Sequence, residues 1–246
     1  MGAEMPGKKD EAAETLARSV EVLWGHPDRP TRGPKPGMSV DRIVQAAIDL
    51  ADTEGMAAVS MQRVASEFGF TTMSLYRYVP GKSELIDLMV DSVLGDPPDL
   101  TAIPGGWRPR LAAWARLTMD CFLRHPWFLP EALQRMMGPR QISWLECAVA
   151  ALAESGLTGE ELLGSVLIVN GYVRSMVPFA TAPPTPDQDR GTLLIRLITD
   201  NAPRYPALTS AIADGAFSPS QHDDIEFGLQ RVLDGIQTYI DSRAPN

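Results

Sequence analysis

Hydrogen-bond donors are concentrated in one short stretch of the chain, within about twelve residues between positions 71 and 82. The stretch holds hydroxyl, phenol, guanidinium and ammonium groups, each of which can donate to a phosphate oxygen or to a base edge. These side chains are Thr71, Thr72, Ser74, Tyr76, Arg77, Tyr78 and Lys82. The chemistry that this cluster predicts is non-covalent recognition of a nucleic acid.

The residues around this cluster predict a helix, a tight turn and a second short helix. Ser60 can cap a first helix in which Met61, Val64, Ala65 and Phe68 recur on one face. Gly69 can end that helix with a positive φ, and Thr71 or Thr72 can cap the next one, which is expected to run to about Val79 before Pro80. This order is typical of a helix-turn-helix, whose second helix enters the major groove. The residues predicted to face DNA therefore also include Ser60 and Arg63 of the first helix.

The phrase TTMSLYRYVPGKSELID closely resembles the recognition-helix segment of the tetracycline-repressor (TetR) family of bacterial transcriptional regulators. The resemblance implies that Tyr76 and Lys82 hold DNA phosphates. It also implies that Thr71, Thr72, Ser74, Arg77 and Tyr78 approach bases or backbone. Two places depart from the family pattern: Met73 stands where a small residue is common, and Tyr78 with Val79 replaces a frequent His-Phe pair. The base-reading set could therefore differ from that of relatives.

Periodicity alone leaves a second interpretation of the same residues open, a core helical hairpin with a polar rim. Bulk charge also argues against DNA at first, because the chain carries a net charge of −9. However, residues 26–82 carry seven basic and six acidic side chains, so most of the acid lies elsewhere. Non-specific DNA affinity should then be weak and strongly salt-dependent.

Pro and Gly clusters divide the chain into three parts, which are residues 1–37, 38–95 and 106–243. The first part combines an amphipathic segment, residues 10–24, with a Pro/Gly-rich arm that carries Arg29, Arg32 and Lys35. Such an arm can follow the DNA backbone or enter the minor groove, and a plain solvated linker is the alternative. The second part adds helices over about 39–54 and 82–94 to the helix-turn-helix. The third part reads as helices over about 107–125, 127–137, 139–154, 159–180, 188–200 and 222–241.

Soft and aromatic side chains in the third part suggest a ligand cavity, although ordinary core packing explains any single one of them. Polar residues within apolar runs add to the case, because each needs a partner if it is buried. The resemblance also implies a small-molecule effector, which C-terminal domains of the family typically bind. The residues predicted to contact it are Trp114, Thr118, Cys121, Phe122, Trp144, Asn170 and Arg174.

Glycine pairs at heptad spacing in two helices predict close helix crossing between two copies of the chain, because a glycine costs about 1 kcal/mol in a helix interior. The phrase IEFGLQRVLDGI also resembles the last helix of tetracycline-repressor-like C-terminal domains. We expect a homodimer joined by a four-helix bundle, and an intrachain helix pair without a dimer is the alternative. The predicted interface residues are Gly164, Gly171, Gly228, Val232, Gly235, Ile236 and Tyr239.

Catalytic signals are lacking: the three histidines are scattered, no metal-ligand spacing appears, and no Gly-rich phosphate loop follows a strand. We therefore expect no enzyme, metal or cofactor. The two cysteines do not form a Cys-x-x-Cys pair, and the longest apolar run contains Asn170 and Arg174, so a cytoplasmic protein without a membrane span is expected. A helical small-molecule-binding protein that ignores DNA is the remaining alternative.

The expected fold is all-α, with an N-terminal three-helix helix-turn-helix domain and a C-terminal helical domain for ligand binding and dimerisation. The expected partners are a double-stranded DNA operator, a small effector and a second copy of the chain.

Overall fold

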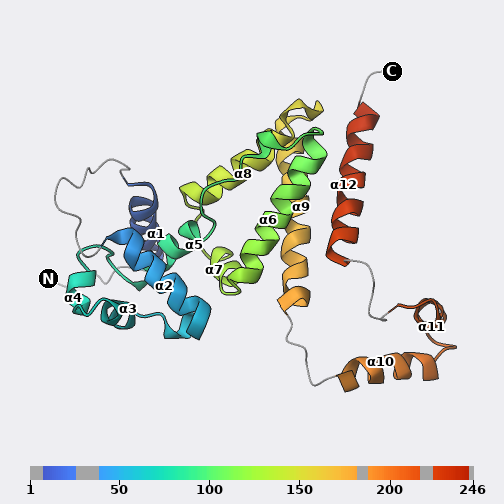
Figure 1. Ribbon diagram of the computed structural model, residues 1–246, viewed down its shortest axis with the longest axis horizontal. Coiled ribbons are helices and arrows are strands. Elements are labelled where there is room, and N and C mark those ends of the chain that lie inside the picture. Colours follow the sequence, from blue (N-terminus) through green and yellow to red (C-terminus); the bar gives the residue numbers. More distant parts are fainter. Residues whose placement is uncertain (1–7, 26–38, 182–187, 217–223, 244–246) are drawn as a thin grey trace.

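The computed structural model describes residues 8–25, 39–181, 188–216 and 224–243, and within these ranges every regular element is a helix (Figure 1). The all-α prediction is therefore confirmed. The basic residues Arg29, Arg32 and Lys35 of the predicted DNA-contacting arm lie outside the described residues.

Five helices form the N-terminal part of the fold. They are α1 (Lys8–Trp24), α2 (Val40–Glu54), α3 (Met61–Glu67), α4 (Thr72–Leu75) and α5 (Lys82–Ser92), with a short 3-10 turn over Met56–Ala58. The apolar faces of α2 to α5 meet in one core, in which Ile43, Val64, Leu75 and Leu85 are fully buried. Helix α2 packs on α3 and α5, and α3 packs on α4, as a helix-turn-helix requires.

The helix-turn-helix differs from the sequence prediction in two details. Gly69 ends α3 at φ +67° as predicted, but α4 stops at Leu75, and residues 76–78 form a turn. The turn that follows is closed by the backbone N–H groups of Tyr78 and Val79, which both donate to the Leu75 carbonyl, at 2.9 and 3.1 Å, and Pro80 disfavours a helical conformation only at Val79. The predicted hydroxyl cap is also wrong: the Thr71 side chain accepts no backbone amide and instead lies 3.1 Å from the Ser74 hydroxyl.

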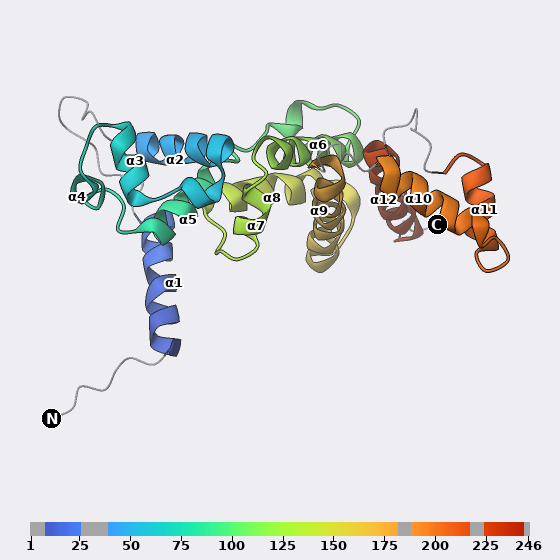
Figure 2. The same ribbon diagram turned by 90° about the horizontal axis from the view of Figure 1, so that it is seen from below.

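Seven helices form the C-terminal part. They are α6 (Trp107–Arg124), α7 (Phe128–Ala132), α8 (Pro139–Ala151), α9 (Gly159–Thr181), α10 (Gln188–Asp200), α11 (Pro206–Ala213) and α12 (Asp224–Arg243), with 3-10 turns over Leu100–Ala102 and Ala153–Ser155. Helix α6 packs on α8, α9 and α12, and α12 packs along α9. Helix α11 was not predicted, and α7 is shorter than the 127–137 segment expected from the sequence. The pair α10–α11 lies at the opposite end of the molecule from α4 (Figure 2).

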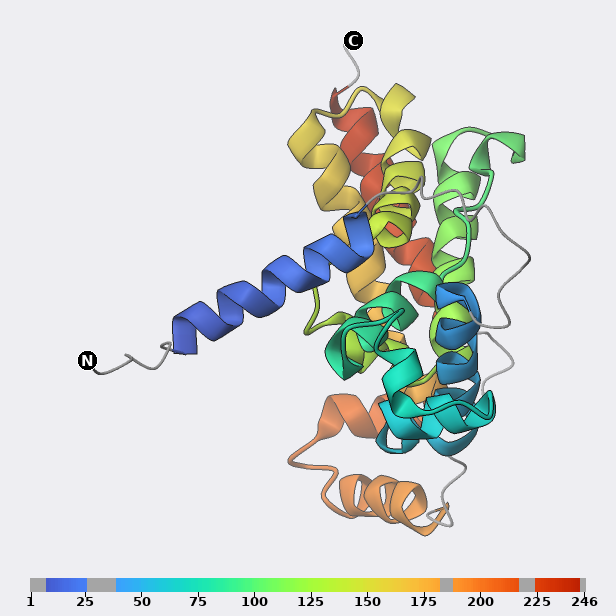
Figure 3. The ribbon, with the colours of Figure 1, turned by 90° about the vertical axis from the view of Figure 1, so that its left-hand side faces the viewer.

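Helix α5 joins the two parts, because it packs on α1 and α2 on one side and on α7 and α8 on the other. Two buried acids on α5 make the polar contacts. Asp87 accepts from the Ser19 hydroxyl of α1 at 2.6 Å and from the Arg135 guanidinium at 2.7 Å. Beyond Ser19 and its neighbours, α1 projects away from the body of the molecule (Figure 3).

Asp91 serves as the cap of a helix that is distant in the sequence. Its Oδ1 accepts from the backbone N–H groups of Arg140 and Gln141, at 3.0 and 3.1 Å, in the first turn of α8. These amides have no partner inside their own helix. Burial raises the pKa of Asp91 above its usual value, although the two amide bonds act in the opposite direction.

No helix in the described ranges is long and apolar enough to cross a membrane.

The Asp91 cap gives a stability prediction. Asp91→Ala leaves the two α8 amides without their acceptor and should lower the free energy of unfolding by about 1–3 kcal/mol. Asp91→Asn is the matched control, because it keeps an oxygen acceptor and removes the buried charge, and it should cost much less. Urea unfolding measures both variants.

The difference in stability between the wild type and Asp91→Asn should depend on pH, and its sign follows from the raised pKa of Asp91. Because the folded pKa of Asp91 lies above its unfolded value, ionisation of Asp91 lowers stability as pH rises through these two values. Stability of the wild type relative to Asp91→Asn should therefore fall with rising pH. Equal losses for the alanine and asparagine variants would contradict the cap.

Candidate nucleic-acid interface and effector cavity

The short helix α4 presents its polar side chains to solvent because two apolar residues anchor it. Leu75 and Val79 are fully buried, whereas Tyr76 and Tyr78 are 45% and 39% exposed. The structure leaves Thr71 and Arg77 exposed as well, with Thr72 and Ser74 half-buried beside them. The outlier Met73 is 73% exposed, so this departure from the family pattern lies on the outer surface.

Lys82 lies beside this surface as the first residue of α5, and it is exposed. Ser60 and Arg63, by contrast, have partners within the domain. The Ser60 hydroxyl accepts from the Arg63 amide at 3.1 Å, and the Arg63 guanidinium lies 2.9 Å from Glu54 and 3.5 Å from Glu67. Exposed ion pairs of this kind are worth at most about 1 kcal/mol, so a phosphate could replace them.

A cavity of about 320 Å³ lies between α6, α9 and α12. Six of its ten lining residues are apolar, and the other four can form hydrogen bonds. The lining residues are Ala115, Arg116, Met119, Asp120, Leu123, Tyr172, Val173, Ile225, Glu226 and Leu229. Its size and its mixture of apolar walls with a few polar groups are typical of small-molecule sites.

The polar groups of this cavity are held in fixed positions. The Arg116 guanidinium donates to both oxygens of Glu226, at 2.9 and 2.6 Å, and the Gln230 amide donates to Glu226 at 2.7 Å. The hydrogen bond from Arg116 holds the pKa of Glu226 below its usual value. Tyr172 donates from its hydroxyl to the Ile225 carbonyl at 2.8 Å, which joins α9 to α12 at the cavity wall.

Five of the predicted effector residues lie on a different face of α6 and in α8, packed against the end of α5, α7 and α8. The Trp114 indole donates to the Trp144 carbonyl at 2.9 Å, and the Thr118 hydroxyl donates to the Trp114 carbonyl. Phe122 stacks on Phe128 with ring centroids 5.2 Å apart. None of the predicted effector residues lines the cavity between α6, α9 and α12. The α6 wall of this cavity is instead the neighbouring stripe Ala115, Met119 and Leu123, at i, i+4 and i+8.

The two thiols are also part of packed surfaces. Cys121 is buried and lies 3.7 Å from the Val93 carbonyl, and burial raises its pKa to about 11. Cys147 is half-buried, and burial raises its pKa to about 11 as well.

Asn170 and Arg174, the other two predicted effector residues, lie on α9. The Oδ1 atom of Asn170 is buried and has no hydrogen-bond partner among the described residues. An unsatisfied buried acceptor costs about 1–3 kcal/mol, so a donor from outside the subunit would be favourable here. Arg174 has an exposed side chain whose guanidinium is partly shielded from water, and this desolvation lowers its pKa.

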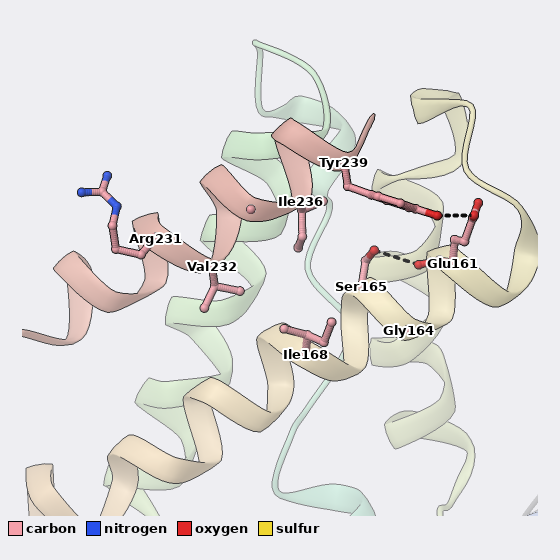
Figure 4. A pocket seen from close by; sticks show the side chains of 9 residues that line it. Glu161, Gly164, Ser165, Ile168, Arg231, Val232, Ile236 and Tyr239 are labelled. Atoms are coloured by element: carbon pink, nitrogen blue, oxygen red, sulfur yellow. Dashed lines mark hydrogen bonds between the residues drawn. The ribbon is translucent and has the colours of Figure 1, made fainter. Parts of the chain in front are cut away.

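An open groove of about 390 Å³ runs between α9 and α12 (Figure 4). Its lining includes Gly164, Val232, Gly235, Ile236 and Tyr239, five of the seven residues predicted for the dimer interface. Alongside it, α9 exposes three large apolar side chains, Leu163, Leu167 and Ile168, of which Ile168 is 60% exposed. A Cβ built on Gly164, Gly171 or Gly235 would meet no atom within 4 Å, so these glycines face open space.

Gly228 requires a correction. A Cβ at this position would overlap the Tyr172 side chain of the same subunit. The intrachain packing of α12 on α9 therefore already requires a glycine here, whether or not a second copy approaches.

At one end of the groove, Glu161 joins α9 to α12. The Tyr239 hydroxyl and the Arg243 guanidinium each donate to Glu161 at 2.6 Å. The hydrogen bond from Tyr239 is the main reason that the pKa of Glu161 falls to about 2. Among the described residues, no cluster of three or more His, Cys, Asp or Glu side chains could hold a metal ion.

Two family descriptions match this chain. Residues 43–89 match the bacterial regulatory proteins of the tetR family, and residues 100–240 match the tetracyclin repressor-like C-terminal domain. The HTH-type transcriptional repressor DrrR1 of Streptomyces coeruleorubidus is 39% identical over 93% of this chain and 88% of its own length. An HTH-type transcriptional regulator of Saccharopolyspora erythraea is 31% identical over 62% of this chain and 64% of its own length.

Solved structures give the same likeness. Apo ActR of Streptomyces coelicolor superposes with a TM-score of 0.72 at 25% identity, over 86% of this chain and 100% of ActR. The complex of ActR with actinorhodin gives a TM-score of 0.69 at 25% identity, over 84% of this chain and 98% of ActR.

Proposed function

This chain belongs to the TetR family of bacterial regulatory proteins, and from that premise we propose that it is a repressor that binds a palindromic operator as a homodimer and leaves it when a small, largely apolar effector binds. Residues 38–95 form the DNA-binding domain, and residues 106–243 form the domain for effector binding and dimerisation. The observation that carries the proposal is the exposed polar surface of α4, held outward by the buried side chains of Leu75 and Val79.

The side chains of α4, of the turn that follows it and of the start of α5 divide into two roles by chemistry. Tyr76 and Lys82 supply a phenol and an ammonium at the edge of the surface, and these hold phosphates and fix the docking. Arg77 and Thr72 can donate to base edges, and Met73 offers an apolar contact for a thymine methyl group. Because residues 26–82 are almost neutral overall, these direct contacts have to supply most of the operator selectivity.

The second copy of the chain is expected on the groove between α9 and α12. Exposed Leu163, Leu167 and Ile168 form an apolar surface beside glycines that face open space, which allows helix backbones from another subunit to approach closely. Two α9–α12 pairs would then form a four-helix bundle around a two-fold axis. A dimer places two copies of α4 about 34–36 Å apart, the spacing of successive major grooves.

The effector is expected in the cavity between α6, α9 and α12. Its apolar walls favour a largely apolar molecule, and the Arg116–Glu226 pair and Tyr172 can orient hydrogen-bonding groups on it. The structures of ActR in complex with (S)-DNPA and with actinorhodin support effector binding by a protein of this fold. An effector can change operator affinity only through its different affinities for the two conformers, typically by a coupling of about 1–3 kcal/mol.

The DNA proposal is tested by selecting bound fragments from random DNA and measuring the affinity of the protein for the selected fragments. Lys82→Ala and Tyr76→Ala should weaken binding to all sequences, and Lys82→Ala should reduce the salt slope by about one. Arg77→Ala should cost about 1–3 kcal/mol and relax the preference at one base pair in each half-site. Arg196→Ala on α10 is the matched control, and it should change neither the operator affinity nor the base preference. If the wild type selects no fragment, the chain is better described as a helical small-molecule-binding protein.

The dimer proposal is tested by Ile168→Glu, which puts a charge in the centre of the exposed α9 surface. Sedimentation equilibrium should show a dimer for the wild type and a monomer for the variant, because an unpaired charge cannot be buried cheaply. Leu133→Glu is the control, since Leu133 is similarly exposed at 62% but lies beyond the groove. A dimer that survives Ile168→Glu would rule out this interface.

The effector proposal is tested by Met119→Trp, which takes up volume inside the cavity. Compounds that release the wild type from its operator in a fluorescence-anisotropy screen should require at least about tenfold higher concentration with this variant, a loss of about 1.4 kcal/mol. Leu117→Trp on the exposed side of the same helix is the control. Unchanged release by Met119→Trp would place the effector elsewhere.

A further inference from the structure

One carboxylate of the DNA-reading domain is held by two donors from the effector domain. Asp52 lies in the last turn of α2, and the Trp127 indole donates to its Oδ1 at 2.6 Å. The Nδ1 atom of His125 lies 2.9 Å from both oxygens of Asp52. Since a carboxylate only accepts, this second bond requires a proton on Nδ1. The His125 and Asp52 side chains are 16% and 26% exposed, although Asp52 as a whole residue is exposed, so the contact is partly shielded from water.

Asp52 lies at an unfavourable position in its helix, so the stability of α2 does not explain why an acid is found there. An acid in the last turn of a helix is disfavoured by the helix dipole. Asp52 therefore gains little within α2, and its hydrogen-bond partners among the described residues, His125 and Trp127, both come from the other domain. Helix α2 is the first helix of the DNA-reading domain and packs on α3 and α5, so a movement of its end reorients that domain.

The donor residues His125 and Trp127 lie at the end of the helix that lines the effector cavity. His125 is the C-cap of α6, and Leu123, two residues earlier, lines the cavity together with Met119 and Ala115. A ligand that displaces the last turns of α6 must displace His125 and the adjoining Trp127. The contacts of α5 run to different elements, because Asp87 binds Arg135 and Asp91 binds the start of α8, and none of these residues lines the cavity.

We propose that Asp52, His125 and Trp127 are positioning residues. When a ligand occupies the cavity lined by α6, these residues carry the displacement of α6 to helix α2, and so to the DNA-reading surface. The α5 contacts through Asp87 and Asp91 serve as the pivot. This inference rests on the proposed function, because it assumes operator binding and an effector in this cavity.

The test is a double-mutant cycle that needs no identified effector. Leu123→Ala changes the cavity wall two residues before His125. Asp52→Asn removes the charge and replaces one of the two oxygens that face His125 by an NH2 group that cannot accept, so that, unlike at Asp91, one of the acceptors in use is lost. Operator affinity is measured by anisotropy, with DNA fragments that the wild-type protein selected from a random pool. Leu123→Ala should change the operator Kd by at least about fivefold in the wild-type background, within the usual range of allosteric coupling. In the Asp52→Asn background, the change should fall below about twofold.

Asp49→Asn is the matched control. Asp49 lies on the same helix, but its carboxylate accepts from Gln45 of α2 and does not reach the effector domain. In the Asp49→Asn background, Leu123→Ala should change the operator Kd as much as it does in the wild-type background. Trp127→Phe gives a second route if Asp52→Asn fails to fold, because it keeps an aromatic ring at this buried position, removes the indole N–H donor and should also uncouple Leu123→Ala. Urea unfolding of each variant separates lost coupling from lost stability.

Two results would overturn the inference while leaving the proposed function intact. One is a Leu123→Ala effect of the same size with and without Asp52→Asn or Trp127→Phe. The other is a Leu123→Ala protein whose operator Kd equals that of the wild type. A wild-type protein that selects no DNA would instead overturn the proposed function itself.

Discussion

A buried carboxylate must find hydrogen-bond donors, and this constraint fixes how the two parts of the molecule meet. Asp87 and Asp91 are each only 4% exposed on α5, and their donors come from α1, from Arg135 and from the start of α8. Asp52 at the end of α2 is less buried, but it also accepts from a residue of the C-terminal part, Trp127. Arg135, the start of α8 and Trp127 thus supply donors from the C-terminal part to acids of the N-terminal part. Apolar packing brings the parts together, and these directional bonds select one relative orientation.

The helix-turn-helix was predictable from the sequence because its signals are local. The apolar spacing from Met61 to Phe68, the glycine at the turn and the capping serine all act within a few residues, and the structure has each of them as expected. The length of α4 was overestimated because the backbone N–H groups of Tyr78 and Val79 both donate to the Leu75 carbonyl and form a turn, a choice that residue types alone do not reveal. The Thr71 cap failed because its hydroxyl pairs with Ser74, a choice that composition alone does not reveal.

The cavity was harder to place because α6 is apolar on more than one side. One stripe of this helix, with Trp114 and Phe122, packs against α7 and α8, and the adjacent stripe, with Ala115 and Met119, faces α9 and α12. Sequence periodicity shows both stripes but not which neighbour each one meets. Gly228 shows the same difficulty, since a glycine needed for a close approach does not say whether the approaching side chain, here Tyr172, belongs to its own subunit.

The state of the two cysteines limits what kind of signal this protein can sense. Burial raises the pKa of both Cys121 and Cys147 to about 11, so the protonated thiol predominates at neutral pH. Peroxides and electrophiles attack the thiolate and not the thiol. Burial of Cys121 and Cys147 therefore disfavours redox sensing through either thiol.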